Sequence, residues 1–263
     1  MRPRYLVVPS GRPSLPARRP IRLLALLAAR NEMRYLPAFM ANVAPHVDGI
    51  VALDDGSTDG SADYLSSRPE VLKVLRVPPG RPDWDEVGNH RALVAAGVEL
   101  GADWLVSLDA DERVEREFGL RARRVIRRGR LLGLTAYHLR LRELWDSESA
   151  YRIDGIWGRK LPARLFAARA DHRLDERPLH AFKVPLQARR VGASWPIADL
   201  EVYHLRMVHP DDRRARRERY ELADPESRWQ PGIGYAYLTD ERGVTLRRVP
   251  PGRGFENGQP GAP

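Results

Sequence analysis

The sequence predicts an α/β fold with a mostly parallel central sheet flanked by helices and a more irregular second half. Short apolar segments alternate with amphipathic ones between residues 21 and 113, which is typical of βαβ units with right-handed crossovers. Hydrophobic residues make up 43% of the 263 residues, enough to bury one core. We therefore expect a single domain, with residues 21–113 as its first half and residues 114–248 as its second.

The elements of the first half follow from the spacing of apolar residues. Apolar segments with the length of strands occupy residues 21–29, 50–53, 71–77 and 104–108. Helical spacing predicts helices over residues 32–43, over a segment that ends at residue 65, and over residues 84–100. Ser57 or Thr58 is expected to cap the second of these helices.

The second half and the two ends are less regular. We expect strands at residues 134–141 and 161–168, a loop at residues 175–182 and a helix at residues 210–222. Five prolines among the first 20 residues predict an irregular N-terminal arm. Residues 249–263 are expected to form a loose C-terminal tail.

Composition excludes several classes of protein. Without cysteine, the chain cannot carry disulfides, thiolate zinc sites or a cysteine nucleophile, and a cytoplasmic location is expected.

Residues 23–29 follow three arginines and could belong either to a signal peptide or to a buried parallel strand. No apolar stretch approaches the roughly 20 residues that span a bilayer. We expect a soluble protein, and peripheral association with the inner face of a membrane stays open.

The net charge of +9 first suggests nucleic acid as a partner, since basic side chains release counterions from phosphates. Only three of the 44 basic residues are lysines, and arginines gather at residues 121–130 and 211–220. Both segments also fit solvated helix faces, with some arginines available for phosphate contact. No aromatic residues interleave with these clusters, so we do not expect nucleic-acid binding.

Acidic residues stand directly after three of the predicted strands. Glu32 follows the first strand, Asp54 and Asp55 the second, and Asp109 and Asp111 the fourth. Ligands of open α/β sheets bind beyond the carboxyl ends of the strands, where these side chains would converge. Hard oxygen ligands of this kind suit magnesium or manganese. The alternative is that they only cap helices and form turns.

The combination of motifs is more specific than any one of them. Ala29-Arg-Asn-Glu32, residues 47–60, residues 88–93 and Leu108-Asp-Ala-Asp-Glu112 resemble, in order and spacing, the family 2 glycosyltransferases of the GT-A fold. The resemblance covers about residues 21–113. It implies that residues 21–29 form the first core strand and are not a signal peptide. It also implies a nucleoside-diphosphate sugar as donor and a divalent cation, Mn²⁺ or Mg²⁺, as cofactor.

The resemblance further implies roles for individual residues around the donor. The segment after the first strand would line the nucleotide pocket: Ala29, Arg30, Asn31 and Glu32. Asp54 and Asp55 would contact the base and the ribose, and Asn89 matches a frequent asparagine whose role could be structural. Asp109, Ala110 and Asp111 look like the DxD motif of the family, with Asp111 as the expected direct metal ligand and Asp109 holding the ribose or the same ion.

An inverting transfer needs a general base for the acceptor hydroxyl, and here the match weakens. Four acidic residues are candidates: Glu143, Glu148, Asp175 and Glu176. We favour Glu176, with Asp175 beside it, because the two follow a predicted strand in a polar loop. Relatives often carry a His-Glu pair near this point, whereas His180 is followed by Ala181. Glu176 could instead be a surface ion-pair partner or contact the acceptor.

Other residues of the second half stay open between two roles. His180 and His204 either line the site or are structural, and the aromatic segment at residues 144–160 either forms an acceptor wall or packs under the sheet. Any of three arginines could balance the diphosphate charge: Arg213, Arg214 and Arg217.

The predicted activity is a metal-dependent, inverting transfer of a sugar from a nucleoside-diphosphate donor to a hydroxyl of a glycan, a lipid-linked molecule or a small molecule. The alternatives are a catalytically degenerate protein that binds nucleotide sugars and a basic nucleic-acid-binding protein.

Overall fold

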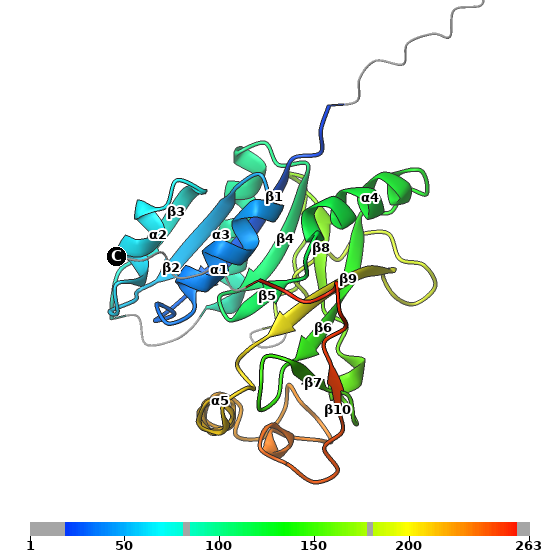
Figure 1. The fold of residues 1–263 in the computed structure, drawn as a ribbon. Coiled ribbons are helices and arrows are strands. Elements are labelled where there is room, and N and C mark those ends of the chain that lie inside the picture. The colour runs from blue at the N-terminus through cyan, green and yellow to red at the C-terminus, as the bar shows by residue number, and fades with distance from the viewer. Residues whose placement is uncertain (1–18, 81–84, 178–180, 257–263) are drawn as a thin grey trace, which may run out of the picture.

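The computed structural model describes residues 19–80, 85–177 and 181–256, and the predicted α/β class is confirmed in them. An eight-stranded sheet in the order β3-β2-β1-β4-β8-β6-β9-β5 forms the centre of the molecule, and a smaller lobe lies below it (Figure 1). None of the described helices is both long enough and apolar enough to cross a membrane.

The first half of the sheet is parallel, as predicted. Its strands are β1 (Leu23–Ala29), β2 (Ile50–Asp55), β3 (Val71–Val77) and β4 (Trp104–Asp109). They pair in parallel as β1 with β2, β2 with β3, and β1 with β4. The helices between them are α1 (Leu36–Val43), α2 (Ser61–Ser67) and α3 (Glu86–Glu99).

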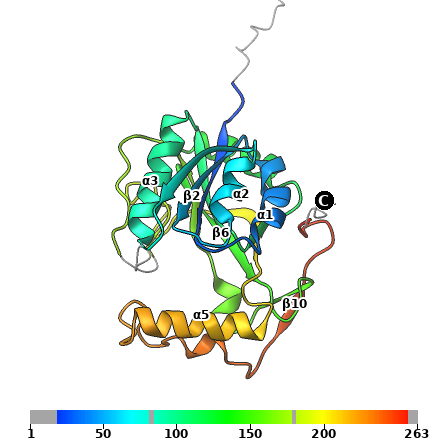
Figure 2. The ribbon, with the colours of Figure 1, turned by 90° about the vertical axis from the view of Figure 1, so that its left-hand side faces the viewer.

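The sequence of β1 is apolar throughout because helices cover both faces of this strand. Leu23 and Leu27 pack in the same cluster as Phe39 of α1, whereas Leu24 and Leu26 pack with α3. Figure 2 shows α3 on one face of the sheet and α1 and α2 on the other. The apolar run at residues 23–29 therefore forms a central buried strand.

Two predicted helix starts are wrong, and backbone geometry explains both. Asn31 has a φ of 55°, in the left-handed region, and α1 begins only at Leu36, with a proline in its first turn. Helix α2 begins at Ser61 after Gly60, whose φ is 90°, and it has no side-chain cap. Ser57 instead accepts a hydrogen bond from the amide of Asn31 at 2.9 Å. The two left-handed residues thus define the turns that follow β1 and β2.

The second half of the sheet is mixed. Its strands are β5 (Glu112–Val114), β6 (Ala136–Glu143), β8 (Ala163–Ala167) and β9 (Ile197–His204), and α4 (Phe118–Arg130) packs beside β9. Strand β8 is antiparallel to β4 and β6, β6 is parallel to β9, and β9 is antiparallel to β5. The sequence analysis missed β5 and β9, although the buried residues Ala198, Leu200 and Val202 of β9 alternate as a strand requires.

The lower lobe contains β7 (Ala150–Arg152), η2 (Trp157–Arg159), α5 (Pro210–Ala223), η3 (Ala236–Leu238) and β10 (Leu246–Arg248). Trp145 and Trp157 are buried in its apolar cluster, which favours the packing role over an acceptor wall. Within the predicted C-terminal tail, Phe255 packs on the main core and Arg253 pairs with Glu115 at 2.6 Å.

The burial of His90 on α3 gives a pH-dependent prediction. Nε2 of His90 lies 2.8 Å from the carbonyl oxygen of Lys183, and the ring meets Phe166 edge-on. Burial lowers the pKa of His90 to about 3, and the charge of Lys183 acts in the same direction.

Because the unfolded chain takes up this proton near pH 6.5 and the folded chain does not, the stability contribution is present above pH 6.5 and is lost as the pH falls toward 3. The variant His90→Gln should show a shallower fall in unfolding free energy over this window, by up to about 1.4 kcal/mol per pH unit. Urea unfolding at several pH values measures the slope, with the exposed His209→Gln as control. Equal slopes for wild type and His90→Gln would contradict the prediction.

Candidate functional site

The register of the parallel strands brings the predicted donor-site residues to one edge of the sheet. Ala29 at the end of β1 pairs with Asp54 of β2, and Ala28 pairs with Asp109 of β4. Glu32 follows β1, and Asp111 follows β4 after the buried Ala110. The carboxyl ends of three neighbouring strands therefore carry the acidic residues, at the place where α/β sheets bind ligands.

On the β2 side of this edge, buried polar atoms lack hydrogen-bond partners among the described residues. Asp54 accepts from the amide of Ser57 at 3.1 Å through Oδ2, while its Oδ1 is buried and has no hydrogen bond there. Nδ2 of Asn89 on α3 is likewise buried and has no hydrogen bond to any described residue. Arg30 lies 3.9 Å from the fully buried Asp55. Buried polar atoms without partners call for an explanation, and a polar ligand supplies one.

The turn after β4 is organised by Arg164, which extends from β8. Its guanidinium contacts Glu112 at 2.7 Å and Asp109 at 3.1 Å. Glu112 also accepts from the backbone amide of Asp109 at 3.0 Å, so one carboxylate fixes both the arginine and the backbone. The side chain of Asp109 remains 51% exposed, whereas that of Glu112 is fully buried. Arg164 thus presents Asp109 at the open end of the strand.

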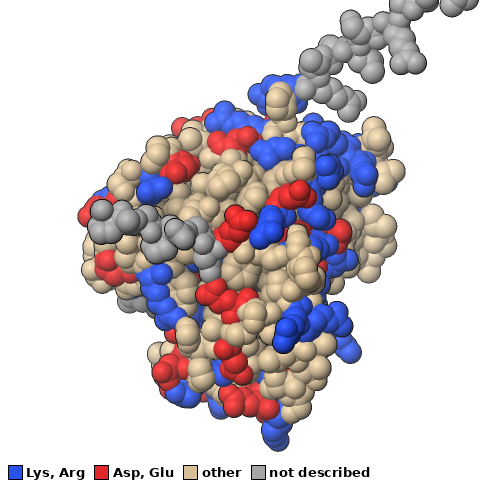
Figure 3. Space-filling model, viewed as in Figure 1, with Lys and Arg blue, Asp and Glu red and all other residues tan. Residues whose placement is uncertain are grey.

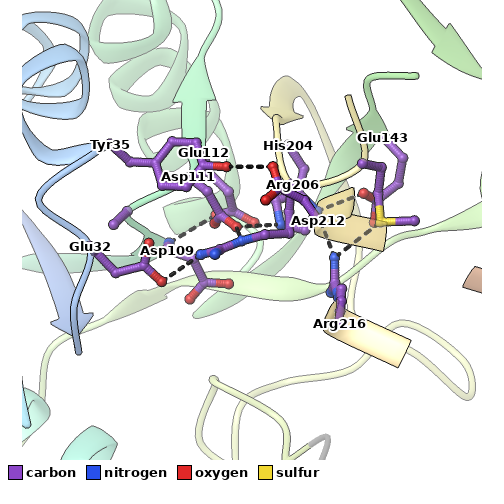
Figure 4. A network of polar contacts seen from close by, with 12 residues as sticks. Glu32, Tyr35, Asp109, Asp111, Glu112, Glu143, His204, Arg206, Asp212 and Arg216 are labelled. Atoms are coloured by element: carbon purple, nitrogen blue, oxygen red, sulfur yellow. Dashed lines mark hydrogen bonds and ion pairs between the residues drawn. The ribbon is translucent and has the colours of Figure 1, made fainter. Parts of the chain in front are cut away.

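Asp111 belongs to a network of alternating charges that extends from Glu32 after β1 to Glu143 at the end of β6 (Figure 4). Its Oδ2 accepts from Nε of Arg206 at 2.6 Å and from Nε2 of His204 at 3.1 Å. Arg206 also pairs with Glu32. Nδ1 of His204 lies 2.6 Å from Glu143, which holds Lys160 at 2.6 Å.

Both ring nitrogens of His204 face carboxylates, so the ring is an imidazolium that donates from each side. Burial opposes its charge, but Glu143 and Asp111 outweigh burial and raise the pKa of His204 to about 10. Burial likewise opposes ionisation of Asp111 and Glu143, yet the cations around them hold both pKa values below the ordinary range. These carboxylates are therefore ionised at neutral pH.

Glu112 differs from Asp111 and Glu143 because its pKa lies above the ordinary value. Burial raises its pKa to about 7, although Arg164 acts against the shift and Asp109 adds to it. Its Oε1 is buried without a hydrogen bond among the described residues. A proton on Glu112 near neutral pH would relieve the repulsion between this carboxyl and Asp109.

The state of His204 can be checked directly. In Glu143→Gln the ring loses one of its two carboxylates, so deprotonation of His204 should move to lower pH than in the wild type. ¹⁵N NMR of the histidine rings between about pH 5 and about 11 measures this titration, since the wild-type midpoint is expected near the upper end of that range. The control Glu226→Gln removes an exposed carboxylate from the surface. An unchanged midpoint in Glu143→Gln would show that Glu143 does not hold the charge of His204.

The two favoured general-base residues, Glu176 and Asp175, lie apart from this network in the described contacts, whereas the candidate Glu143 belongs to it. Glu176 is 80% exposed and pairs with Arg91 of α3 at 3.1 Å. Asp175 accepts from Arg177 at 2.6 Å and from the amide of Phe182 at 2.9 Å. Burial raises the pKa of Asp109 and Asp111 adds to that effect, but Arg164, and after it Lys183 in the same segment as Asp175, hold the pKa below its ordinary value. His180 is outside the described residues.

Apart from Arg30, the arginines near the acidic edge are not the three that the sequence analysis selected to balance the diphosphate charge. The network is contacted instead by Arg164, Arg206 and Arg216. Arg213 is buried between Asp146 and Glu241, Arg214 pairs with Asp211, and Arg217 pairs with Glu221. A possible signal in the sequence was the charged Arg164 inside the otherwise apolar strand β8.

The donor set at the edge suits a hard divalent cation that is shared with a substrate. Among the described residues, no group of three or more histidine, cysteine or acidic side chains is arranged to hold a metal. Mg²⁺ is commonly held by one or two carboxylates together with substrate phosphates and water. Asp109, half-exposed and ionised, and Asp111, ionised two residues later, fit that pattern.

The chain resembles known proteins either over only part of its length or at low sequence identity. No family model matches the chain. Two mycobacterial proteins, the uncharacterized protein Mb3815c of Mycobacterium bovis and Rv3786c of Mycobacterium tuberculosis, are each 35% identical over 106 residues. That stretch is 39% of this chain and 26% of each relative, so the chain matches about a quarter of their length.

Solved structures show a likeness in general architecture. S. aureus TarS 1-349 in complex with UDP is 15% identical over 83% of this chain and 68% of its own, with a TM-score of 0.49. Glucosyl-3-phosphoglycerate synthase from M. tuberculosis, in complex with Mn²⁺, UDP and glucosyl-3-phosphoglycerate, is 19% identical over 47% of this chain and 44% of its own, with a TM-score of 0.31. These values do not identify a family.

Proposed function

We propose that the protein is a metal-dependent, inverting glycosyltransferase of the GT-A type, which moves a sugar from a nucleoside-diphosphate donor to a hydroxyl acceptor. The supporting observation is the convergence of Asp54, Asp55, Asp109 and Asp111 at the carboxyl ends of β2 and β4, the two parallel strands that flank β1. The motifs that supply them resemble family 2 glycosyltransferases in order and spacing. The edge is also where ligands of open α/β sheets bind.

The nucleoside half of the donor would occupy the β2 side of the edge. Carboxylates accept hydrogen bonds from a base N–H or a ribose hydroxyl, so Asp55 and the unsatisfied Oδ1 of Asp54 would serve this purpose. The segment Ala29-Arg-Asn-Glu32 would form the adjacent wall. Asn89 would contribute an amide that donates to the donor.

Asp109 and Asp111 would hold the divalent cation at the diphosphate. When bound, the cation supplies positive charge that stabilises the leaving diphosphate. Arg164 keeps Asp109 ionised, and His204 together with Arg206 keeps Asp111 ionised. Lys183 would add positive charge on the same side of Asp109.

Glu176, with Asp175 beside it, remains our proposed general base. A surface ion pair such as that between Glu176 and Arg91 contributes little stability, so the carboxylate can leave it at small cost. Glu143 is a weaker candidate because His204 and Lys160 already occupy both of its oxygens. Glu176→Gln should lower kcat while leaving donor affinity unchanged, and the reverse result would assign Glu176 to binding.

A catalytically inactive protein that binds nucleotide sugars is the second candidate. It is favoured by the ion pairs that Asp109 and Asp111 already make, and by the absence of described contacts between them and Glu176. Slow hydrolysis of the donor, or transfer to any acceptor in a broad panel, separates the two. Binding without turnover would support the inactive protein.

A thermal-shift experiment tests the proposal at the level of binding. UDP and GDP are compared, each with Mn²⁺ and with a chelator, and at least one should raise the midpoint only when the metal is present. The variant Asp111→Asn should lose the metal-dependent part. Asp171→Asn, which removes an exposed carboxylate paired with Arg169, should keep it. No shift with either nucleotide would refute the proposed function.

A further inference from the structure

The strongest unexplained surface lies on α4. This helix contains no acidic residue between Phe118 and Arg130, and its buried face consists of Phe118, Ala122, Ile126 and Gly129. Its outward face carries Leu120, Arg124, Arg127, Arg128 and Leu131, which recur at helical spacing. Figure 3 shows Lys and Arg side chains gathered over this helix, at the upper right.

The arginines of this face are not neutralised by the protein. Arg124, Arg127, Arg128 and Arg130 are exposed and make no ion pair with any described residue, unlike most arginines of the chain. Arg121 and Arg123, nearer to the start of the helix, pair with Glu117 and Asp48. The unpaired charge is therefore concentrated at the C-terminal end of α4.

Two leucines stand exposed beside this charge. Leu131 is 79% exposed and Leu132 is 63% exposed, directly after the last turn of α4. Arg189 donates to the carbonyl oxygen of Leu132, which brings the segment with Arg190 and Val191 to the same end, and Val191 is 61% exposed. Large apolar side chains within an uncompensated basic patch indicate a binding surface.

We infer that this surface docks the protein on a bilayer that contains anionic lipid. We define the α4 surface as Leu120, Arg124, Arg127, Arg128, Arg130, Leu131 and Leu132. Arginines attract acidic headgroups, and the leucines enter the boundary between headgroups and acyl chains. Nucleic acid would use the arginines but would leave the leucines in water, and the α4 surface has no aromatic side chain on which bases could stack.

The location of the α4 surface leaves the acidic edge open. Arg130 and Leu131 line a hollow of about 390 Å³ together with Arg19 and Asp103, and Asp103 directly precedes β4. The α4 surface therefore adjoins the amino-terminal ends of the parallel strands, whereas the proposed donor site lies at their carboxyl ends. Docking and donor binding can occur together, and this inference does not depend on the proposed function.

Flotation of the full chain with vesicles tests the inference. The vesicles are phosphatidylcholine alone or with about 30 mol% phosphatidylglycerol, each at low and high salt. Wild type should float with the anionic vesicles at low salt, weakly at high salt, and not with phosphatidylcholine alone. Arg124→Gln/Arg127→Gln/Arg128→Gln should reduce partitioning by about 100-fold, since each arginine near an anionic surface contributes about fivefold.

Two further variants show which surface and which partner are involved. Arg169→Gln/Arg228→Gln/Arg242→Gln removes the same net charge from exposed surface ion pairs and should float almost like wild type. Leu131→Ser/Leu132→Ser keeps the charge and should lose most of the binding that persists at high salt. All variants should retain the wild-type unfolding midpoint, because the substituted side chains are exposed.

Several outcomes would overturn the inference. Failure of wild type to float with anionic vesicles rejects a lipid surface. If both triple-arginine variants lose vesicle binding equally, the binding depends on the net charge of the protein and not on the α4 surface. If duplex DNA binds wild type and the leucine variant alike, and anionic vesicles compete poorly, the α4 surface is a nucleic-acid site. Thermal shift with nucleotide and Mn²⁺, measured on the same variants, reports separately on the donor site.

Discussion

Replacing Arg164 with methionine should lower the free energy of unfolding by about 3–5 kcal/mol. The guanidinium is the charged partner of the fully buried Glu112 and of Asp109. Breaking a buried ion pair by removing one partner leaves an uncompensated buried charge, and this mechanism causes losses of that size. Urea unfolding at pH 8 measures the effect, because Glu112 is then mostly ionised in the wild type, whereas in the variant it must either stay charged without its partner or take up a proton.

A second substitution should repair part of this loss. In Arg164→Met/Glu112→Gln the buried site is neutral, so the double variant should be more stable than Arg164→Met alone. Because burial raises the pKa of Glu112 to about 7, the stability that comes from its protonated form is present below pH 4.5 and is lost as the pH rises through 7. Arg164→Met should therefore recover stability on acidification. A loss below about 1 kcal/mol at pH 8 would contradict this description of the site.

Replacing Asp111 with asparagine should reduce turnover by about 10²–10³-fold and remove the metal-dependent part of nucleotide binding. The substitution preserves shape but removes the charge that would hold the cation against the diphosphate. A steady-state assay with the active donor, together with nucleotide titrations at several Mn²⁺ concentrations, measures both effects.

Interpretation of this variant requires two controls. Asp111 also supports His204 and Arg206, so the unfolding midpoint of Asp111→Asn must be compared with that of wild type. Asp171→Asn controls for the loss of one negative charge at an exposed position. Turnover within threefold of wild type in a folded Asp111→Asn, about 0.7 kcal/mol, would exclude Asp111 as a metal ligand in the reaction.

The sequence predicted the central parallel strands well because both of their faces are covered. Buried parallel strands appear as continuous apolar runs, and the run at residues 104–108 coincides with most of β4. Strand β3 lies at the edge of the sheet and is only partly buried, yet its apolar residues still outnumber Lys73 and Arg76 enough to predict it. The same reasoning located the acidic residues at the strand ends. Strand β9 was missed because its alternating pattern includes two charged residues, the exposed Asp199 and the buried Glu201, which pair with Arg140 and Arg142 of β6.

The arginines that pair with the acidic residues of the candidate site could not be predicted, because their contacts join distant parts of the chain. Arg164 meets Glu112 across 52 positions, and Arg206 meets Asp111 across 95. No local spacing rule relates such residues, and 41 arginines compete for the same role. The sequence did offer Glu143 and His204 as candidates, but only the sheet register places them beside each other, as Cα partners of β6 and β9.

The central claim is that Asp109 and Asp111 hold a divalent cation at the diphosphate of a nucleotide donor. A crystal soaked with Mn²⁺ and the nucleotide selected by thermal shift tests it most directly, through the anomalous signal of manganese. We predict one manganese peak in contact with Asp109 and Asp111 and with the diphosphate, and the nucleoside beside Asp54 and Asp55. Nucleotide bound elsewhere, or bound at this edge with no manganese near either aspartate, would contradict the claim.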